Sequence, residues 1–173
     1  MTFELIGVGI LDAFSLLLGV IFLALVVSTI IGVPCMPTHR RQAKKMAEIA
    51  GLKPGMVTVD LGSGNGRILF NAAKYGARAI GYELNPMLVA WTKLMVRMRG
   101  LKGTVEVKMR SIYDADVKDV DVVFAFLMPK PMEKLEPKLF KELKPGALII
   151  SYTFSFPNHQ PIKKEQGIFV YKV

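Results

Sequence analysis

From residue 56 onwards, the sequence alternates segments typical of strands with segments typical of helices. The short apolar runs predict strands at 56–62, 77–83, 103–109, 120–127 and 147–156. Helices are expected at 40–52, 67–76, 85–100 and 132–146. This alternation predicts an α/β fold, a doubly wound, Rossmann-like sheet covered by helices. The tail, 161–173, favours a closing hairpin, so the last strand can run antiparallel.

Glycine and proline residues set the expected ends of the helices. Gly76 and Gly100 stop two of them, and Pro86 opens the helix at 85–100. Pro137 lies inside the helix expected at 132–146 and predicts a kink or a break there. Trp91 and the methionines of its helix fit core packing.

The N-terminal part of the chain is strongly apolar. Residues 13–33 contain no charge and are enough for a helix that crosses the hydrocarbon core of a bilayer. Acidic residues precede this segment, and basic residues follow it at Arg40, Arg41, Lys44 and Lys45. This bias places the rest of the chain on the cytoplasmic or mitochondrial matrix side. We expect a membrane anchor at 1–35, single-pass or monotopic, and a globular domain at 36–173; a helix buried in that domain is the alternative.

The overall charge is positive, because 23 Lys and Arg outnumber 14 Asp and Glu and give a formal net charge of +9. Such a charge attracts nucleic acid, anionic lipid or an acidic partner, and does not choose among them. Cys35 is the single cysteine, which excludes an intrachain disulfide and a zinc site built from cysteines. No metal is expected.

A glycine-rich turn, "DLGSGNG" at 60–66, follows the first strand. In a doubly wound sheet the ligand crevice lies at this point. The third glycine comes one position earlier than in the dinucleotide fingerprint, where Arg67 stands instead, and the P-loop pattern is absent. Glu83 ends the second strand, where a carboxylate can accept both hydroxyls of a ribose. Together these features indicate a nucleoside site.

Two of these stretches, "VDLGSGNGRI" and "GYELNP", resemble the cofactor motifs of class I S-adenosylmethionine-dependent methyltransferases. Over nearly the whole chain, "VPCMPT", "MPKPMEKLEPKL" and "FSFPNHQP" extend the likeness. They resemble the membrane-anchored lysine methyltransferases of the adenine nucleotide translocase and the ATP synthase c-subunit, with their prokaryotic relatives. Asn65 stands where that family usually has Asp, and Met87 and His159 stand where Trp is usual. Ser111 stands where many methyltransferases carry an acid.

The resemblance implies a seven-strand methyltransferase sheet that binds S-adenosylmethionine. Asp60 would hold the turn or the ammonium of the cofactor, and Leu84 and Ile112 would enclose its adenine. Pro37 and Thr38 resemble a lid. The expected cofactor-binding residues are Pro37, Thr38, Asp60, Leu61, Gly62, Ser63, Gly64, Gly66, Glu83, Leu84, Asn85, Ser111 and Ile112.

Methyl transfer from a sulfonium is an in-line displacement, so the protein mainly positions and desolvates the reactants. A lysine nucleophile must be neutral, and an apolar pocket lowers its pKa. No dedicated base is required if water removes the proton. The candidate walls follow strands four and five: Phe126, Leu127, Met128, Pro129, Phe154, Phe156, Pro157 and His159. For each residue, core or loop packing is the alternative, and His159 either accepts a proton or makes a structural hydrogen bond.

We therefore expect a protein-lysine N-methyltransferase that acts on membrane-associated proteins, with the lipid bilayer as a further partner. A methyltransferase for a lipid or quinone headgroup, an RNA methyltransferase and a non-catalytic cofactor-binding adaptor remain alternatives. Nucleic acid is the less favoured partner. The stretch after strand four reads "LMPKP", in contrast to the Asn-Pro-Pro-Tyr type motif of adenine amino-group methylation.

Overall fold

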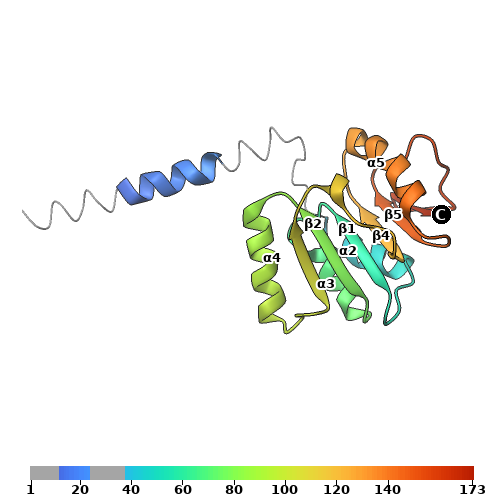
Figure 1. The fold of residues 1–173 in the computed structure, drawn as a ribbon, viewed down its shortest axis with the longest axis horizontal. Helices are drawn as coiled ribbons and strands as arrows, with labels where there is room; N and C mark the ends of the chain where they lie inside the picture. Colours follow the sequence, from blue (N-terminus) through green and yellow to red (C-terminus); the bar gives the residue numbers. More distant parts are fainter. Residues whose placement is uncertain (1–11, 24–37) are drawn as a thin grey trace, which may run out of the picture. The chain divides into compact units, whose positions relative to one another are not determined.

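A computed structural model describes residues 12–23 and 38–173 (Figure 1). The chain divides into two compact units, Met1–Pro34 and Cys35–Val173. In the first unit, residues 12–23 form a helix with exposed apolar side chains such as Leu16. Among the described residues, no helix is both long enough and apolar enough to cross a bilayer. Residues 24–33 of the expected membrane segment and Pro37 of the expected lid lie outside the described residues.

The second unit contains one seven-stranded mixed sheet in the order β3-β2-β1-β4-β5-β7-β6. The strands are β1 Val57–Leu61, β2 Arg78–Glu83, β3 Val105–Met109, β4 Val122–Ala125, β5 Leu148–Tyr152, β6 Lys163–Glu165 and β7 Ile168–Lys172. The first five run parallel, whereas β7 is antiparallel to β5 and β6. The predicted Rossmann-like α/β sheet is confirmed, including the reversed last strand.

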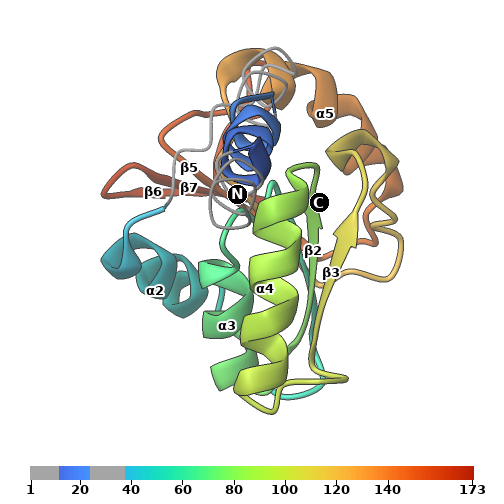
Figure 2. The ribbon, with the colours of Figure 1, turned by 90° about the vertical axis from the view of Figure 1, so that its left-hand side faces the viewer.

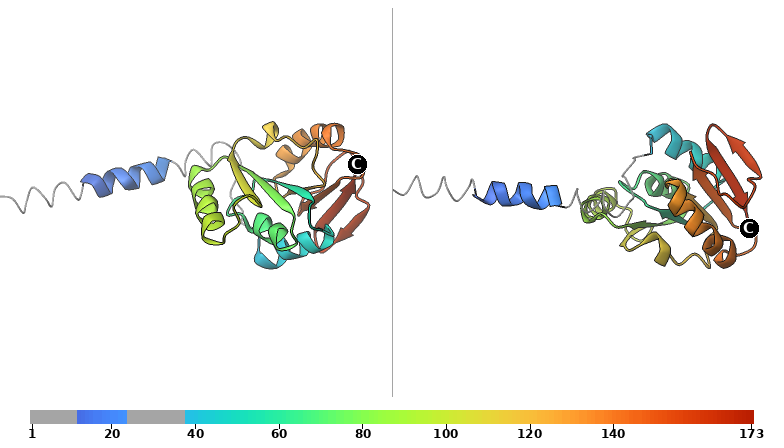
Figure 3. Two further views of the ribbon diagram at one scale, coloured as in Figure 1. Left: turned by 60° about the horizontal axis from the view of Figure 1, so that its bottom comes forward. Right: turned by 90° about the horizontal axis from the view of Figure 1, so that it is seen from above.

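Helices cover both faces of the sheet (Figure 2). Three of them, α2 Arg40–Ile49, α3 Arg67–Lys74 and α4 Pro86–Met98, pack on one face with alternate strand residues such as Ile150 and Val170. The neighbouring strand positions, Ile149 and Tyr171, point to the other face, because successive side chains alternate along a strand. Helix α5, Pro129–Glu142, covers that face, and a short 3-10 helix η1, Ile112–Asp114, follows β3. Figure 3 shows the β6–β7 hairpin at the opposite end of the sheet from α4.

Strand β1 is the topological switch point of the sheet. It pairs with β2 on one side and with β4 on the other. The connections that leave its neighbourhood therefore run to opposite sides, and a crevice opens beyond its carboxyl end. This arrangement places the turn 62–66 at the edge of the sheet where ligands bind in such folds.

Two elements differ from the prediction at strand β5 and helix α5. β5 ends at Tyr152, because the Ser151 hydroxyl donates a hydrogen bond to the Phe154 carbonyl, 2.9 Å away, and turns the chain. Helix α5 begins at Pro129 and continues through Pro137, so the predicted break is wrong. Pro137 has no N–H to donate to the carbonyl of Glu133 one turn earlier, and both residues are exposed. Water can replace that bond at the surface.

The expected core packing of Trp91 and of the methionines of its helix is wrong for Trp91, Met87 and Met98, which are exposed, and right for Met95, which packs against the core. The side chain of Trp91 is half exposed, as is that of Leu94 in the same helix. The buried residues of α4 are Val89, Thr92 and Val96, which lie on the opposite face of the helix. Hydrophobicity alone does not tell which face of a helix meets the sheet, and α4 has apolar residues on both.

Candidate active site

The glycine turn leaves β1 in a conformation that needs glycine. Gly62, Gly64 and Gly66 have φ values of 82°, 53° and 77°, in the left-handed region that other residues adopt only with strain. The N–H groups of Gly62 and Ser63 both donate to the Tyr82 carbonyl, at 2.9 and 3.0 Å. The turn is therefore attached to the end of β2.

The third glycine makes room for the neighbouring helices. A Cβ atom at Gly66 would lie 2.9 Å from Cγ2 of Thr92 and 3.0 Å from the ring of Phe70. The Thr92 hydroxyl also donates to the Gly64 carbonyl, 3.3 Å away. The structure thus gives Gly66, which the sequence grouped with the cofactor site, a packing role: it lets α4 approach the turn.

Glu83 holds the other side of the turn. Its Oε2 accepts a hydrogen bond from the Gly64 N–H at 2.9 Å, and its Oε1 accepts one from the Asn85 N–H at 2.8 Å. The side chain is buried. Each carboxylate oxygen keeps a further lone pair that can accept a ribose hydroxyl. The Asn85 side chain in turn caps α4 by accepting the N–H groups of Met87 and Leu88.

A pocket lies at the turn, at the carboxyl ends of β1 and β4. Its lining consists of Thr38, Asp60, Gly62, Ser63, Gly64, Asn65, Arg67, Ile68 and Phe126. Asp60 is only 3% exposed, and its carboxylate has no hydrogen-bond partner among the described residues. Burial, with a smaller contribution from the charge of Glu83, raises the pKa of Asp60 to about 8. A carboxylate in this position is suited to a bound cation, because an opposite charge favours its ionised form.

These residues fit S-adenosylmethionine. The cofactor carries an ammonium group, which the Asp60 carboxylate can bind, and ribose hydroxyls, which Glu83 can accept. The Ser63 hydroxyl, also in the pocket lining, is buried without a partner among the residues that the structure describes. Groups of three or more potential metal ligands are absent from the described residues.

The residues expected around the adenine lie at the ends of β2 and β3. Leu84 is exposed, whereas Ile112 is buried at the start of η1. The Ser111 hydroxyl accepts a hydrogen bond from the Tyr113 N–H at 3.3 Å. Ser111 thus begins η1 and positions the backbone of this edge.

Arg67 is a site residue to which sequence reasoning gave no role. Its Nη1 donates to the Thr38 carbonyl at 2.7 Å and attaches the expected lid to the first residue of α3. The available signal was its position, where the dinucleotide fingerprint has its third glycine.

Aromatic residues at the ends of β4 and β5 stand beside the pocket. The Phe126 ring, in the lining, lies 5.0 Å from the Tyr152 ring, centroid to centroid. Tyr152 was missed, because the sequence assigned it to the middle of a longer strand. It is followed by Thr153, whose φ of 71° is rare for a β-branched residue. Phe154 is half-buried next to this bend.

Residues 127–129 connect the pocket to helix α5. Leu127 is buried and packs near the turn: a Cβ atom at Gly62 would lie 3.2 Å from its Cδ2. Met128 is partly exposed and Pro129 is the first residue of α5.

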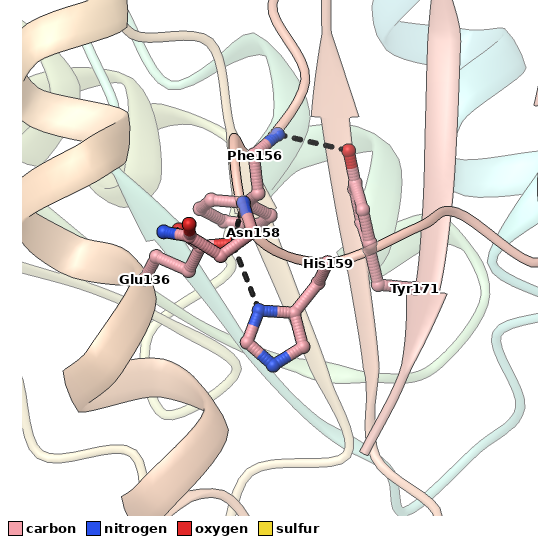
Figure 4. A network of polar contacts seen from close by, with 5 residues as sticks. All are labelled: Glu136, Phe156, Asn158, His159 and Tyr171. Atoms are coloured by element: carbon pink, nitrogen blue, oxygen red, sulfur yellow. Dashed lines mark hydrogen bonds and ion pairs between the residues drawn. The ribbon is translucent and has the colours of Figure 1, made fainter.

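Phe156 and His159 pack against α5 and do not line this pocket (Figure 4). The Phe156 N–H donates to the Tyr171 hydroxyl at 3.0 Å, and its ring packs edge-on to Tyr171. His159 stacks on Phe140 with ring centroids 3.5 Å apart. Pro157 is exposed in the same loop.

Glu136 organises this loop and was missed in the sequence. It is 1% exposed, and its carboxylate accepts hydrogen bonds from the Asn158 N–H at 3.0 Å, Asn158 Nδ2 at 2.8 Å and His159 Nδ1 at 2.8 Å (Figure 4). Burial raises the pKa of Glu136, but the hydrogen bonds from His159 and Asn158 outweigh it and hold the pKa below its ordinary value. The available signal was an acid at a helix position flanked by Met132, Leu135 and Leu139 on the same stripe.

Comparisons with known proteins agree with this geometry. Residues 60–163 match the family model of the ANTKMT methyltransferase domain. The chain is 34% identical to a protein-lysine N-methyltransferase of Saccharolobus islandicus (strain REY15A), over 78% of this chain and 87% of that protein. It is 37% identical to the adenine nucleotide translocase lysine N-methyltransferase of Mus musculus, over 75% of this chain but only 57% of the mouse protein.

A solved structure is similar as well. It is the crystal structure of an RNA methyltransferase from Salinibacter ruber in complex with S-adenosyl-L-homocysteine. The two chains are 34% identical, with a TM-score of 0.74 over 79% of this chain and 91% of that chain. The fold, the cofactor residues and these matches lead to one conclusion. The chain belongs to the S-adenosylmethionine-dependent methyltransferase family of the ANTKMT methyltransferase domain, which includes protein-lysine N-methyltransferases.

Proposed function

We propose that the protein transfers a methyl group from S-adenosylmethionine to the side-chain amine of lysines in membrane-associated proteins. The observation that carries this proposal is the pocket in which the Asp60 carboxylate, without a hydrogen-bond partner in the described part of the chain, meets the glycine turn and Phe126. Similarity to lysine methyltransferases, one of which is named for the adenine nucleotide translocase, supports the choice of acceptor.

S-adenosylmethionine supplies an electrophilic methyl group on a sulfonium. The ionised Asp60 carboxylate would hold the ammonium group of the cofactor, and Glu83, which accepts the Gly64 N–H, would hold the ribose hydroxyls. Phe126 and Tyr152 form an apolar wall beside the pocket, and this wall favours the neutral form of an incoming lysine. Water accepts the proton of that lysine, so the reaction needs no dedicated base. The other candidate walls, such as Met128 and Phe154, extend this surface.

We further propose that residues 1–35 anchor the protein and that 36–173 carry the chemistry on the cytoplasmic or mitochondrial matrix side. Arg40 and Arg41 are exposed in α2 and can face anionic headgroups, whereas the exposed Lys44 lies 3.5 Å from the Glu48 carboxylate. Lys45 differs, because its ammonium lies 2.7 Å from the Glu165 carboxylate of β6 and forms an ion pair with it. An anchor keeps the pocket close to membrane-protein lysines and so increases their effective concentration.

The test is methyl-label transfer by the full-length protein to membrane fractions. We expect label in lysine residues of membrane proteins, mapped by mass spectrometry, and none with the Asp60→Asn variant. A lipid-headgroup enzyme would instead label the organic extract. Label in lipid with none in protein contradicts the proposal.

RNA methylation is the second candidate. The Salinibacter ruber RNA methyltransferase favours it, as does the net charge of +9. Incubation with total RNA and nuclease treatment of the product separate the two acceptors. Nuclease-sensitive label would support RNA, whereas protease-sensitive label supports lysine.

A further inference from the structure

Helix α4 carries an apolar stripe on its outer face, made of Met87, Trp91, Leu94 and Met98. These side chains are 55, 50, 49 and 70% exposed. At about 100° per residue, their spacing places them within an arc of roughly 60°. The buried residues of α4 lie on the opposite side of the helix and face β2 and β3. The stripe therefore contributes nothing to the core.

The charged residues of α4 and of the turn that follows it have a single sign. Between residues 84 and 105 there is no acidic residue. Lys93 and Arg97 are exposed along one flank of the stripe, and Lys102 follows the helix. Arg99 is used elsewhere, since its guanidinium lies 4.2 Å from the centre of the Phe70 ring. An apolar face with tryptophan, flanked by cations, is the pattern of helices that lie in the interface of anionic bilayers.

A bilayer satisfies this surface better than other occupants. A second copy that docked through the same face would bring its own Lys93 and Arg97 near those of the first, with no acidic partner on the helix. The apolar segment 13–33 of the same chain carries no charge, so it needs an apolar surrounding of its own, and a bilayer supplies that to the segment and to the stripe alike.

We propose that the outer face of α4 lies in the headgroup region of an anionic membrane, with Trp91 and Leu94 inserted among the acyl-chain ends. The inference rests on the membrane setting of the proposed function and not on lysine as the acceptor. The N-cap residue of α4 is Asn85, whose N–H donates a hydrogen bond to Glu83. A membrane-bound α4 therefore fixes the orientation of the cofactor site relative to the bilayer surface.

Trp91 is the only tryptophan of the chain, so its fluorescence reports on this face alone. The full-length protein is reconstituted in vesicles of phosphatidylcholine and phosphatidylglycerol, with and without bromine on the acyl chains. We expect blue-shifted Trp91 emission in both, and loss of most of the intensity in the brominated vesicles. The N-terminal segment cannot produce this signal, because it contains no tryptophan.

The double variant L94K/M98K tests the stripe. It adds positive charge and keeps good helix formers, so purely electrostatic binding would persist, whereas insertion of the apolar face would not. We expect most of the bromine quenching to disappear. Ile162→Lys is the matched control, an equally exposed apolar residue far along the chain, and keeps the quenching.

Two results would overturn the inference. If the wild-type protein sediments with vesicles but bromine does not quench red-shifted Trp91 emission, the N-terminal segment alone holds the membrane. If the emission is blue-shifted but bromine-insensitive, protein rather than lipid covers the stripe. Neither result bears on methylation of lysine, which the label experiment measures separately.

Discussion

At the scale of single residues, Asp60 couples protonation to folding and to cofactor binding. Its folded pKa of about 8 lies far above the ordinary value of 3.8. The folded protein therefore holds a proton that the unfolded chain has released, and the stability of the cofactor-free protein falls as pH rises from about 4 to about 8. A bound ammonium group reverses this preference of Asp60 for its protonated form, because it stabilises the ionised carboxylate.

Asp60→Asn separates these two effects. The variant keeps a neutral side chain, so above pH 8 we expect it to unfold with a free energy higher than wild type by on the order of a few kcal/mol. Its affinity for S-adenosylmethionine is expected to be very low and independent of pH. We expect the affinity of the wild-type protein to increase with pH up to about 8. Below pH 8, binding of the cofactor to the wild-type protein is expected to release a proton from Asp60. Chemical denaturation measures the free energy of unfolding, and calorimetry in buffers of different ionisation enthalpy measures the affinity and the proton release. Wild-type affinity in the variant would contradict the role assigned to Asp60.

Gly66 combines a positive φ with close contacts. Gly66→Ala puts a methyl group against Thr92 and Phe70, and we expect a loss of about 2–4 kcal/mol in the free energy of unfolding. Gly51→Ala is the control: its φ is 61°, but a Cβ atom there would meet nothing within 4 Å. It is expected to cost about 1 kcal/mol, from the backbone alone. Equal losses in urea titrations would show that packing at the turn is unimportant.

At the scale of elements, the contact between α5 and the loop after β5 depends on the charge of Glu136. Glu136→Gln keeps the shape but weakens the bonds to Asn158 and His159, and we expect a loss of about 1–3 kcal/mol at neutral pH. Because the folded pKa of Glu136 is lowered, this stability is present above its ordinary value of 4.5 and is lost as pH falls through the folded pKa. The difference between variant and wild type therefore shrinks in acid.

Glu142→Gln in the same helix is the matched control. Glu142 pairs with Lys138 near the surface, and its replacement is expected to change the unfolding free energy by less than about 1 kcal/mol. Urea titrations at neutral and acid pH measure both variants. A pH-independent effect of Glu136→Gln would mean that its charge is not what holds the loop.

The sequence predicted the elements better than it predicted which of their faces meet. The succession of strands and helices along the chain and the glycine turn follow from local patterns, such as the acid at Glu83 that ends an apolar run. The contact of Glu136 with His159 joins residues 23 positions apart and depends on how α5 crosses the sheet. The prediction that Trp91 packs in the core was wrong for a related reason, since both sides of α4 are apolar and only the packed structure shows which side meets the sheet. The break predicted at Pro137 was wrong because the sequence does not show that the lost hydrogen bond lies on the solvent side of α5.

At the scale of the whole molecule, Arg67 connects the stretch that follows the N-terminal unit to the pocket. We expect Arg67→Met to release the Thr38 backbone, seen as faster amide exchange at 38–40, and to weaken cofactor binding. Arg41→Met, an exposed arginine of α2, is the control and is expected to change neither. Unchanged exchange at 38–40 in the Arg67 variant would show that other contacts hold this stretch.

The bond from Arg67 to Thr38 also has a mechanical consequence. The acceptor is a backbone carbonyl, so a substitution at position 38 keeps the acceptor, whereas a substitution at position 67 removes the donor. A pulling force applied through the N-terminal residues reaches this bond before it reaches the sheet. We expect tension on the chain to act at Thr38, in the lining of the pocket, before it acts on the strands of the sheet.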